Sequence, residues 1–356
     1  MIFRKSSLVK DVDALTVAVD AQDAARSEAA FNAVLGSIRT AKDKELVAAG
    51  PRLAALVERF PPEPRGMLAV LTGACVERGA DPVACATPLL TAALTTLHDA
   101  ARFREQWAAV SDGDEDPLEL TLSGSEAASV VERLGGYATP GVRTAVAAWA
   151  NLHDWERAAV AMLSHSPVRR ALNQNQRSDL IAATKELGGA DMLRCLYYSL
   201  LVLDDEPLVA LHRESGIGYA LRLTGIGDNF QLHTLLGDVL INGGHVPGQG
   251  PTAKAADLCR DKNVAVEHRP VTVGSFNLVA PDGSWIWNEG TPRDIPVVDG
   301  VRLLVLDKAP YQRSWPAGRF FPNMVADLRL ERVLAPDETA QYFRHVKPLG
   351  NEPRRA

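Results

Sequence analysis

The spacing of apolar side chains along this chain changes once, close to residue 205. Up to that point apolar residues recur three and four positions apart, as at Val12, Leu15 and Val19, which is the period of an amphipathic helix. Beyond it, short segments alternate between apolar and polar residues, which is the period of a strand with one buried face. The pattern therefore predicts an α+β protein with a helical first part and a mixed second part.

The predicted domains follow from this change of period. We expect an all-helical domain over 1–205, a smaller mixed α/β domain with antiparallel hairpins over 206–346, and a polar, disordered tail over 347–356. Breaks rich in Gly and Pro separate the helices, and their spacing suggests stacked hairpins of the HEAT or armadillo kind. No signature recurs at a fixed period, so an irregular helical bundle is the alternative.

Each part also gives local expectations. Pro51 is expected in the first turn of a helix, where its missing N–H has no intrahelical partner. Helical periodicity predicts continuous helices over 139–164, 168–187 and 229–241.

In the second part, alternating segments predict two β-hairpins. The first joins Pro207–Arg213 to Gly218–Thr224 through a short turn. The second joins Val271–Ala280 to Ser284–Asn288 through a Pro-Asp-Gly turn.

Composition and charge narrow the function classes. The 356 residues are 46% hydrophobic and 23% charged, as in an ordinary globular protein. The formal net charge of -6 disfavours nucleic acid as a partner, because phosphate binding needs a basic surface. No apolar run is long enough for a membrane span, and the first residues lack the apolar core of a signal peptide. We therefore expect a cytoplasmic protein without membrane contact.

Motifs predict neither a metal nor a cofactor. The 8 His residues form no HxxxH, HxH or HExxH pair, and no two Cys residues have zinc-site spacing. The acidic loop 111–119 opens like a calcium loop, but Pro117 stands where that loop requires Gly. The stretch Gly225-Ile226-Gly227-Asp228 begins a dinucleotide fingerprint that Phe230 leaves incomplete.

The stretch Gly225–His233, between a predicted strand and a predicted helix, is the first candidate site. Asp228 fits a helix cap, with Gln231 reaching back to the Asp228 N–H. The same helix N-terminus favours anions, and the two Gly residues of the stretch would let the backbone approach a ligand. His233 shares a helix face with Asn229, and a neutral His near a helix N-terminus has a lowered pKa that suits a general base.

A second candidate site combines aromatic and charged residues further along the chain. Trp285 and Trp287 are expected on one face of a strand as an apolar wall, followed by Glu289 as a second acid or base. Arg313 is a candidate clamp for an anionic group. His245 lies in a long Gly-rich loop, which is a candidate lid. Packing against the helical domain is the competing interpretation of the Trp and Arg residues.

These residues support two function hypotheses. In the first, the protein binds a small molecule, or performs metal-free acid–base chemistry, in a cleft between the helical and C-terminal domains. The Ala-rich composition, with 29 Arg against 9 Lys, is typical of GC-rich bacterial coding and suits a tailoring enzyme of specialised metabolism. In the second, a non-enzymatic scaffold or adaptor presents its helical repeat to a protein partner.

Overall fold

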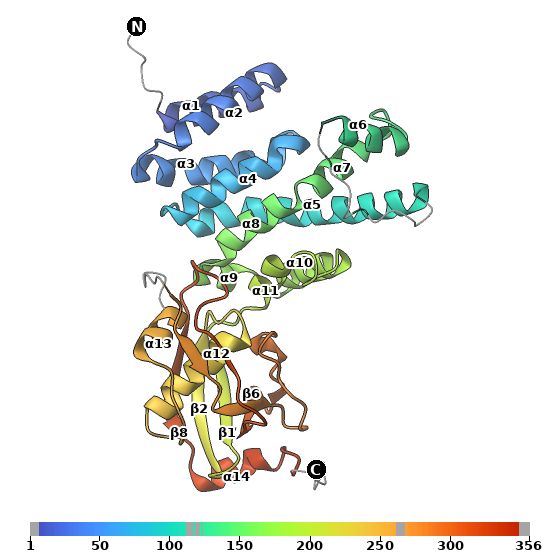
Figure 1. Cartoon of the computed structure of the whole chain (residues 1–356). Coiled ribbons are helices and arrows are strands. Elements are labelled where there is room, and N and C mark those ends of the chain that lie inside the picture. Colours follow the sequence, from blue (N-terminus) through green and yellow to red (C-terminus); the bar gives the residue numbers. More distant parts are fainter. Residues whose placement is uncertain (1–6, 112–116, 118–121, 123, 261–267, 349–356) are drawn as a thin grey trace. The chain divides into compact units, whose positions relative to one another are not determined.

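Figure 1 shows the computed structural model, which describes residues 7–111, 117, 122, 124–260 and 268–348. The chain forms two compact units, Met1–Leu200 and Leu201–Ala356. The first is helical and the second carries a mixed sheet, which confirms the predicted α+β class. Most of the acidic loop and most of the polar tail lie outside the described residues.

Helices joined by short turns make up the N-terminal unit. In chain order they are α1 (Leu8–Asp20), α2 (Ala24–Ile38), α3 (Asp43–Leu56), the 3-10 turn η1 (Val57–Arg59), α4 (Pro62–Glu77), α5 (Pro82–Val110), α6 (Gly124–Arg133), α7 (Val142–Ala150), α8 (Leu152–Leu163), α9 (Ser166–Ala171), α10 (Gln174–Glu186) and α11 (Arg194–Leu201). α1 packs against α2, and α3 against α4, so the first four helices form two stacked hairpins (Figure 1). α5 has 29 residues and contacts α7, α8 and α10, so the regular succession of hairpins ends there. None of the described helices is long and apolar enough to cross a membrane.

Two prolines lie inside helices. The prediction that Pro51 begins a helix is wrong, because it lies inside α3, as Pro88 lies inside α5. A proline leaves the carbonyl four residues before it without its helical donor. Here those carbonyls belong to Val47 and Ala84, which are both exposed, so water can replace the missing donor. The buried face of each helix therefore continues past its proline.

Two helices that were predicted to be continuous are each interrupted at an asparagine. α7 and α8 meet at Asn151, whose side chain donates to the Ala147 carbonyl at 2.7 Å. α9 and α10 are separated at Asn173, whose side chain caps α10 by accepting from the Gln176 N–H at 2.9 Å. The side-chain amide competes with the helical hydrogen bonds at both positions, which apolar periodicity does not register.

The C-terminal unit is built on a mixed sheet. Its elements are β1 (Glu206–His212), β2 (Ile217–Thr224), α12 (Asn229–Leu236), the π-helix η3 (Gly237–Asn242), α13 (Ala253–Arg260), β3 (Val271–Val273), β4 (Phe276–Val279), η4 (Pro292–Asp294), β5 (Val297–Val298), β6 (Val301–Lys308), β7 (Ser314–Pro316), β8 (Asp327–Val333) and α14 (Pro336–Phe343). The main sheet has the strand order β4-β6-β1-β2-β8, with β5 paired to β6, and β3 pairs with β7 in a second sheet. β1 and β2 form the predicted antiparallel hairpin, whereas β1 and β6 run parallel.

Successive side chains of β1 point to opposite faces of the sheet and so belong to two different hydrophobic cores. Leu208 and Ala210 join the core that contains residues of α12 and α13. Val209 and Leu211 join a smaller core on the other face, against which side chains of α14 pack. β6 lies between β4 and β1 and contributes to both cores, which explains its continuous apolar run.

The second predicted hairpin is only partly present. The segment expected as one strand, 271–280, divides at Gly274 into β3 and β4, which belong to different sheets. The Gly274 N–H donates to the Arg313 carbonyl at 2.9 Å, which extends the pairing of β3 with β7 by one residue, and pairing with β6 begins only at Phe276. The returning segment pairs through a single bridge between Val279 and Trp285, so the prediction of a strand through Trp285 and Trp287 is wrong.

Candidate functional site

The polar groups of the stretch Gly225–His233 are largely used within the C-terminal unit. Asp228 caps α12, as predicted: its Oδ1 accepts from the Gln231 N–H at 2.8 Å. Gln231 reaches back one residue further than predicted, because its Oε1 accepts from the Gly227 N–H at 3.0 Å. Its Nε2 donates to the Cys259 carbonyl at 2.7 Å. Gln231 therefore ties the start of α12 to the end of α13.

A loop of the same unit occupies the N-terminal amides of α12. The Asn229 N–H donates to the Gly290 carbonyl at 2.9 Å, and the Phe230 N–H to the Asn288 carbonyl at 3.1 Å. The fully buried Asn229 side chain donates to the Trp287 carbonyl at 2.9 Å. Helix-terminal donors of this kind attract anions when they are unused. Here they hold the loop, so the anion site expected at this helix is filled by the chain itself.

Other segments of the chain pack closely against the two glycines of this stretch. Gly225 has a left-handed φ of 69°, and its N–H donates to the Leu203 carbonyl at 2.9 Å. A Cβ at Gly225 would overlap the Val325 carbonyl oxygen, and one at Gly227 would crowd the Phe321 ring. The space that the missing side chains leave is therefore taken by the protein.

His233 is a core residue, with 2% of its surface exposed. Its ring stacks on Phe276 with the centroids 4.6 Å apart, and lies 4.8 Å from the ring of Trp315. Its Nδ1 is 3.4 Å from the Asn288 Oδ1, and its Nε2 has no partner among the described residues. Burial, and then the positive charge of Arg313, lower the pKa of His233 to about 3. The imidazole is therefore neutral at pH 7.

The three predicted catalytic residues lie in different surroundings. His233 is buried, whereas Glu289 is exposed. Asp228 is partly exposed and lines a hollow of about 350 Å³ together with Arg269 and Arg319. Because His233 is closed to solvent, the three side chains do not face a common open space. Their roles in catalysis stay predictions.

The cap at Asp228 gives a test of its structural role. Asp228→Ala should lower the free energy of unfolding by about 1 kcal/mol, because the Gln231 N–H loses its acceptor. Urea unfolding of the purified variants measures this loss. Asp228→Asn is the matched control, since asparagine caps a helix as well as aspartate does. A loss with asparagine as large as with alanine would show that the charge, and not the cap, matters here.

Trp285, Trp287 and Tyr311 form an exposed aromatic cluster. They are 41%, 61% and 54% exposed. The Trp285 ring centroid lies 5.6 Å from that of Trp287 and 6.5 Å from that of Tyr311. Burying a large apolar side chain is worth about 1.5–3 kcal/mol, so three exposed aromatic residues grouped around Trp285 are costly to keep at a surface. Such a patch is typical of a binding surface.

Beside this cluster lies a cavity of about 740 Å³, named here the Trp285 cavity. It lies where the parallel strands β1 and β6 end, next to β4 and to the turn 281–283. Its polar and charged lining residues are Arg213, Glu214, Asn277, Asp282, Asp307, Lys308 and Lys347. Arg213 forms an ion pair with Asp307 and donates to the Lys347 carbonyl at 3.1 Å. Hydrogen bonds from Ser284 lower the pKa of the Asp282 carboxyl.

Arg313, the predicted anion clamp, faces β4. Its Nη2 donates to the Asn277 Oδ1 at 2.9 Å and to the Phe276 carbonyl at 3.2 Å. Both acceptors are neutral, and Asn277 in turn lines the Trp285 cavity. Arg313 therefore holds a lining residue of the cavity in place. A direct contact with a ligand stays a prediction.

The Gly-rich loop that carries His245 is fastened at several points. The His245 ring is exposed, but its N–H donates to the Leu240 carbonyl at 2.8 Å and its carbonyl accepts from the Tyr219 hydroxyl at 2.8 Å. Further along, the Ser275 hydroxyl donates to the Gln249 carbonyl at 2.8 Å. These bonds hold the loop against the unit, which does not favour the predicted lid.

The Trp285 cavity combines predicted residues with others that the pattern missed. Trp285 lines it, Trp287 contacts Trp285, and Arg313 reaches it through Asn277. Asn277 and Asp307 were missed. Asp307 comes directly after the apolar run of β6, so a polar residue at the end of a buried strand was the available signal.

Known proteins give no guide to the role of this cavity. Comparisons with known protein families, with curated proteins and with solved structures found no match.

Proposed function

We propose that this chain is a small-molecule-binding protein, and that its C-terminal unit binds a neutral, hydroxyl-rich ring of the sugar class in the Trp285 cavity. The observation that carries the proposal is the exposed aromatic cluster at the edge of a cavity with polar walls. A volume of about 740 Å³ lies in the usual range of ligand sites, roughly 300–1,000 Å³.

The aromatic cluster favours a ligand with an apolar face. An aromatic ring carries negative charge on its face, which attracts the slightly positive C–H groups of a saturated ring. Trp285 offers such a face at the cavity, and Trp287 and Tyr311 extend it over the neighbouring surface. A pyranose has one face of C–H groups and an edge of hydroxyl groups, which fits this arrangement.

The charges of the cavity favour a neutral ligand with many hydroxyl groups. Its lining carries three basic residues, Arg213, Lys308 and Lys347, and three acidic residues, Glu214, Asp282 and Asp307. Opposite charges in equal number give no net attraction for an anion or a cation. They do provide both donors and acceptors, which is what hydroxyl groups require.

The location also supports a ligand site. The cavity lies at the carboxyl ends of the parallel pair β1 and β6, and in open sheets with parallel strands ligands bind outside these ends. The walls come from segments far apart in the sequence, since the paired side chains of Arg213 and Asp307 are 94 positions apart. Groups gathered in this way are positioned by the sheet itself.

Binding is favoured over acid–base chemistry at this site. Sugar hydrolysis needs a carboxylic acid that keeps its proton near neutral pH, which requires a raised pKa. The pKa of Asp282 is shifted in the opposite direction. Asp307 is held in an ion pair with Arg213, and the neutral His233 is closed to solvent.

Replacement of Trp285 tests the proposal. Methyl glycosides of glucose, galactose, mannose and N-acetylglucosamine would be titrated into the full chain and followed by saturation-transfer NMR. We expect saturable binding of at least one glycoside, weakened by at least about tenfold in Trp285→Ala, because the aromatic face is lost. Tyr137→Ala is the matched control, since Tyr137 is 59% exposed but lies in the N-terminal unit. Equal binding by the two variants, or no binding of any glycoside, would refute the proposal.

A scaffold or adaptor function is the alternative. Exposed Trp and Tyr residues also dominate the energetics of protein interfaces. A chain that binds none of the glycosides, but loses a protein partner on Trp285→Ala, would favour that alternative.

A further inference from the structure

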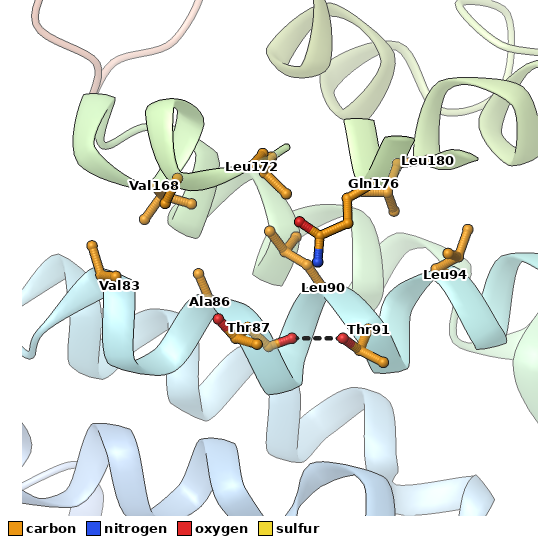
Figure 2. Close-up of a pocket in the computed structure, with 11 residues that line it drawn as sticks. Val83, Ala86, Thr87, Leu90, Thr91, Leu94, Val168, Leu172, Gln176 and Leu180 are labelled. Atoms are coloured by element: carbon orange, nitrogen blue, oxygen red, sulfur yellow. Dashed lines mark hydrogen bonds between the residues drawn. The ribbon is translucent and has the colours of Figure 1, made fainter. Parts of the chain in front are cut away.

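An apolar groove lies on the N-terminal unit, between α5 and the pair α9 and α10 (Figure 2). Its volume is about 240 Å³. The floor is one face of α5, where Val83, Leu90 and Leu94 recur at helical spacing, and the opposite wall includes Leu172 and Leu180. We name it the α5 groove.

The groove exists because the helix that covers α5 is interrupted. α9 ends at Ala171 and α10 begins at Gln174, with Asn173 capping the new helix. Between them the chain turns, and the small side chains of Ala86 and Ala171 leave space over α5. A continuous helix with large residues at these positions would have covered this face.

The lining of the groove is uncharged, and only a few polar groups reach it. The Thr91 hydroxyl donates to the Thr87 carbonyl at 2.9 Å within α5, so its hydrogen is already used. The Gln176 Oε1 accepts from the Asn173 N–H at 3.3 Å. The Gln176 Nε2 makes no hydrogen bond to the described residues, and Figure 2 shows this amide turned toward α5. The Gln176 N–H donors therefore face a lining that is apolar apart from the hydroxyls of Thr87 and Thr91.

We propose that the α5 groove binds an uncharged, mainly apolar small molecule that carries one hydrogen-bond acceptor for the Gln176 amide. The volume supports a small molecule, since it exceeds the roughly 150 Å³ of a cavity that holds benzene. The lining offers no charged partner to an ionic group, which favours an uncharged ligand. This proposal is independent of the sugar-class site, which lies in the other unit and has polar walls.

A neutral fluorescent ketone provides the probe. Prodan is an apolar naphthalene with a single carbonyl acceptor, and its emission shifts to the blue in apolar surroundings. Titration into the full chain should give a saturable blue shift with one site per chain. Trp285→Ala should leave this binding unchanged, which separates the α5 groove from the Trp285 cavity.

Two threonines of α5 give a matched pair of variants. Thr91 and Thr95 are both exposed, and each hydroxyl bonds to the carbonyl four residues earlier, but only Thr91 lines the groove. Thr91→Glu should weaken prodan binding by at least about tenfold, since it places a charge in the groove. Thr95→Glu should bind as the native chain does. Circular dichroism and melting would establish that both variants fold equally well.

The Gln176 amide is tested separately. Gln176→Leu should weaken prodan several-fold, but leave 2-dimethylaminonaphthalene, which lacks the carbonyl, bound as before. The proposal is overturned if prodan does not saturate, or if Thr91→Glu binds it as tightly as Thr95→Glu. Equal loss of both probes in Gln176→Leu would overturn the role assigned to the amide.

Discussion

Replacing Gly225 with alanine should lower the unfolding free energy of the C-terminal unit by about 2–5 kcal/mol. A left-handed φ disfavours a residue with a Cβ by about 1–2 kcal/mol. The new methyl group would also overlap the Val325 carbonyl oxygen, and forced repacking of this kind adds about 1–3 kcal/mol. Both contributions act at the end of β2, where the Gly225 N–H also donates to the Leu203 carbonyl. Urea unfolding, followed by hydrogen exchange of peptides from β1 and β2, measures the loss in this unit.

Gly216 provides the control for Gly225→Ala. It has a similar φ of 66°, but a Cβ there would meet no atom within 4 Å. Gly216→Ala should therefore cost only the backbone contribution, about 1–2 kcal/mol. The difference between the two variants isolates the contact with Val325. Equal losses would contradict the close approach seen in the structure.

Acidification should destabilise the native chain through His233. Its pKa is about 3 in the folded chain and about 6.5 when unfolded, so between these values only the unfolded chain binds the proton. Stability that is complete above pH 6.5 is therefore lost as the pH falls, at about 1.4 kcal/mol per pH unit. By pH 5 the loss due to His233 should reach about 2 kcal/mol.

His233→Phe isolates this contribution. Phenylalanine keeps a flat ring beside Phe276 and cannot be protonated. The unfolding free energy should fall less between pH 7 and pH 5 in the variant than in the native chain. The two falls should differ by about 2 kcal/mol at pH 5. His212, whose pKa is also lowered by burial, is present in both proteins and cancels in the comparison. Parallel pH profiles would show that His233 is accessible to protons in the folded chain, which would restore its candidacy as a base.

The parts of the fold that were predicted correctly depend on neighbouring residues. The β1–β2 hairpin follows from alternation over two adjacent segments, and β6 from an apolar run that both faces of the sheet require. The Asp228 cap is a contact across three residues. The helix breaks at Asn151 and Asn173 depend on side-chain hydrogen bonds, which hydrophobic periodicity does not contain.

The candidate sites depend on contacts between distant residues, so the sequence could supply only some of their members. Trp285 stood out in the sequence as one of two neighbouring tryptophans. Its place in the same cavity as Asp307 follows from its bridge to Val279 and from the antiparallel pairing of β4 with β6. His233 was read as a base because its helix position is favourable, whereas its burial is set by Phe276 and Trp315 from later strands. No sequence pattern predicted the α5 groove, because the groove results from the interruption between α9 and α10 and not from a motif.

The parallel pairing of β1 with β6 also constrains the order in which the chain can fold. The hairpins α1–α2 and α3–α4 join helices that are adjacent in sequence, so these four helices can form soon after they are synthesised. The β1–β2 hairpin is local as well, but one edge of β1 has no partner until β6 arrives some ninety residues later. During synthesis an apolar strand edge therefore stays open to other chains. Slow release from the ribosome, or a chaperone that shields β1, should raise the yield of folded protein more than stronger helices would.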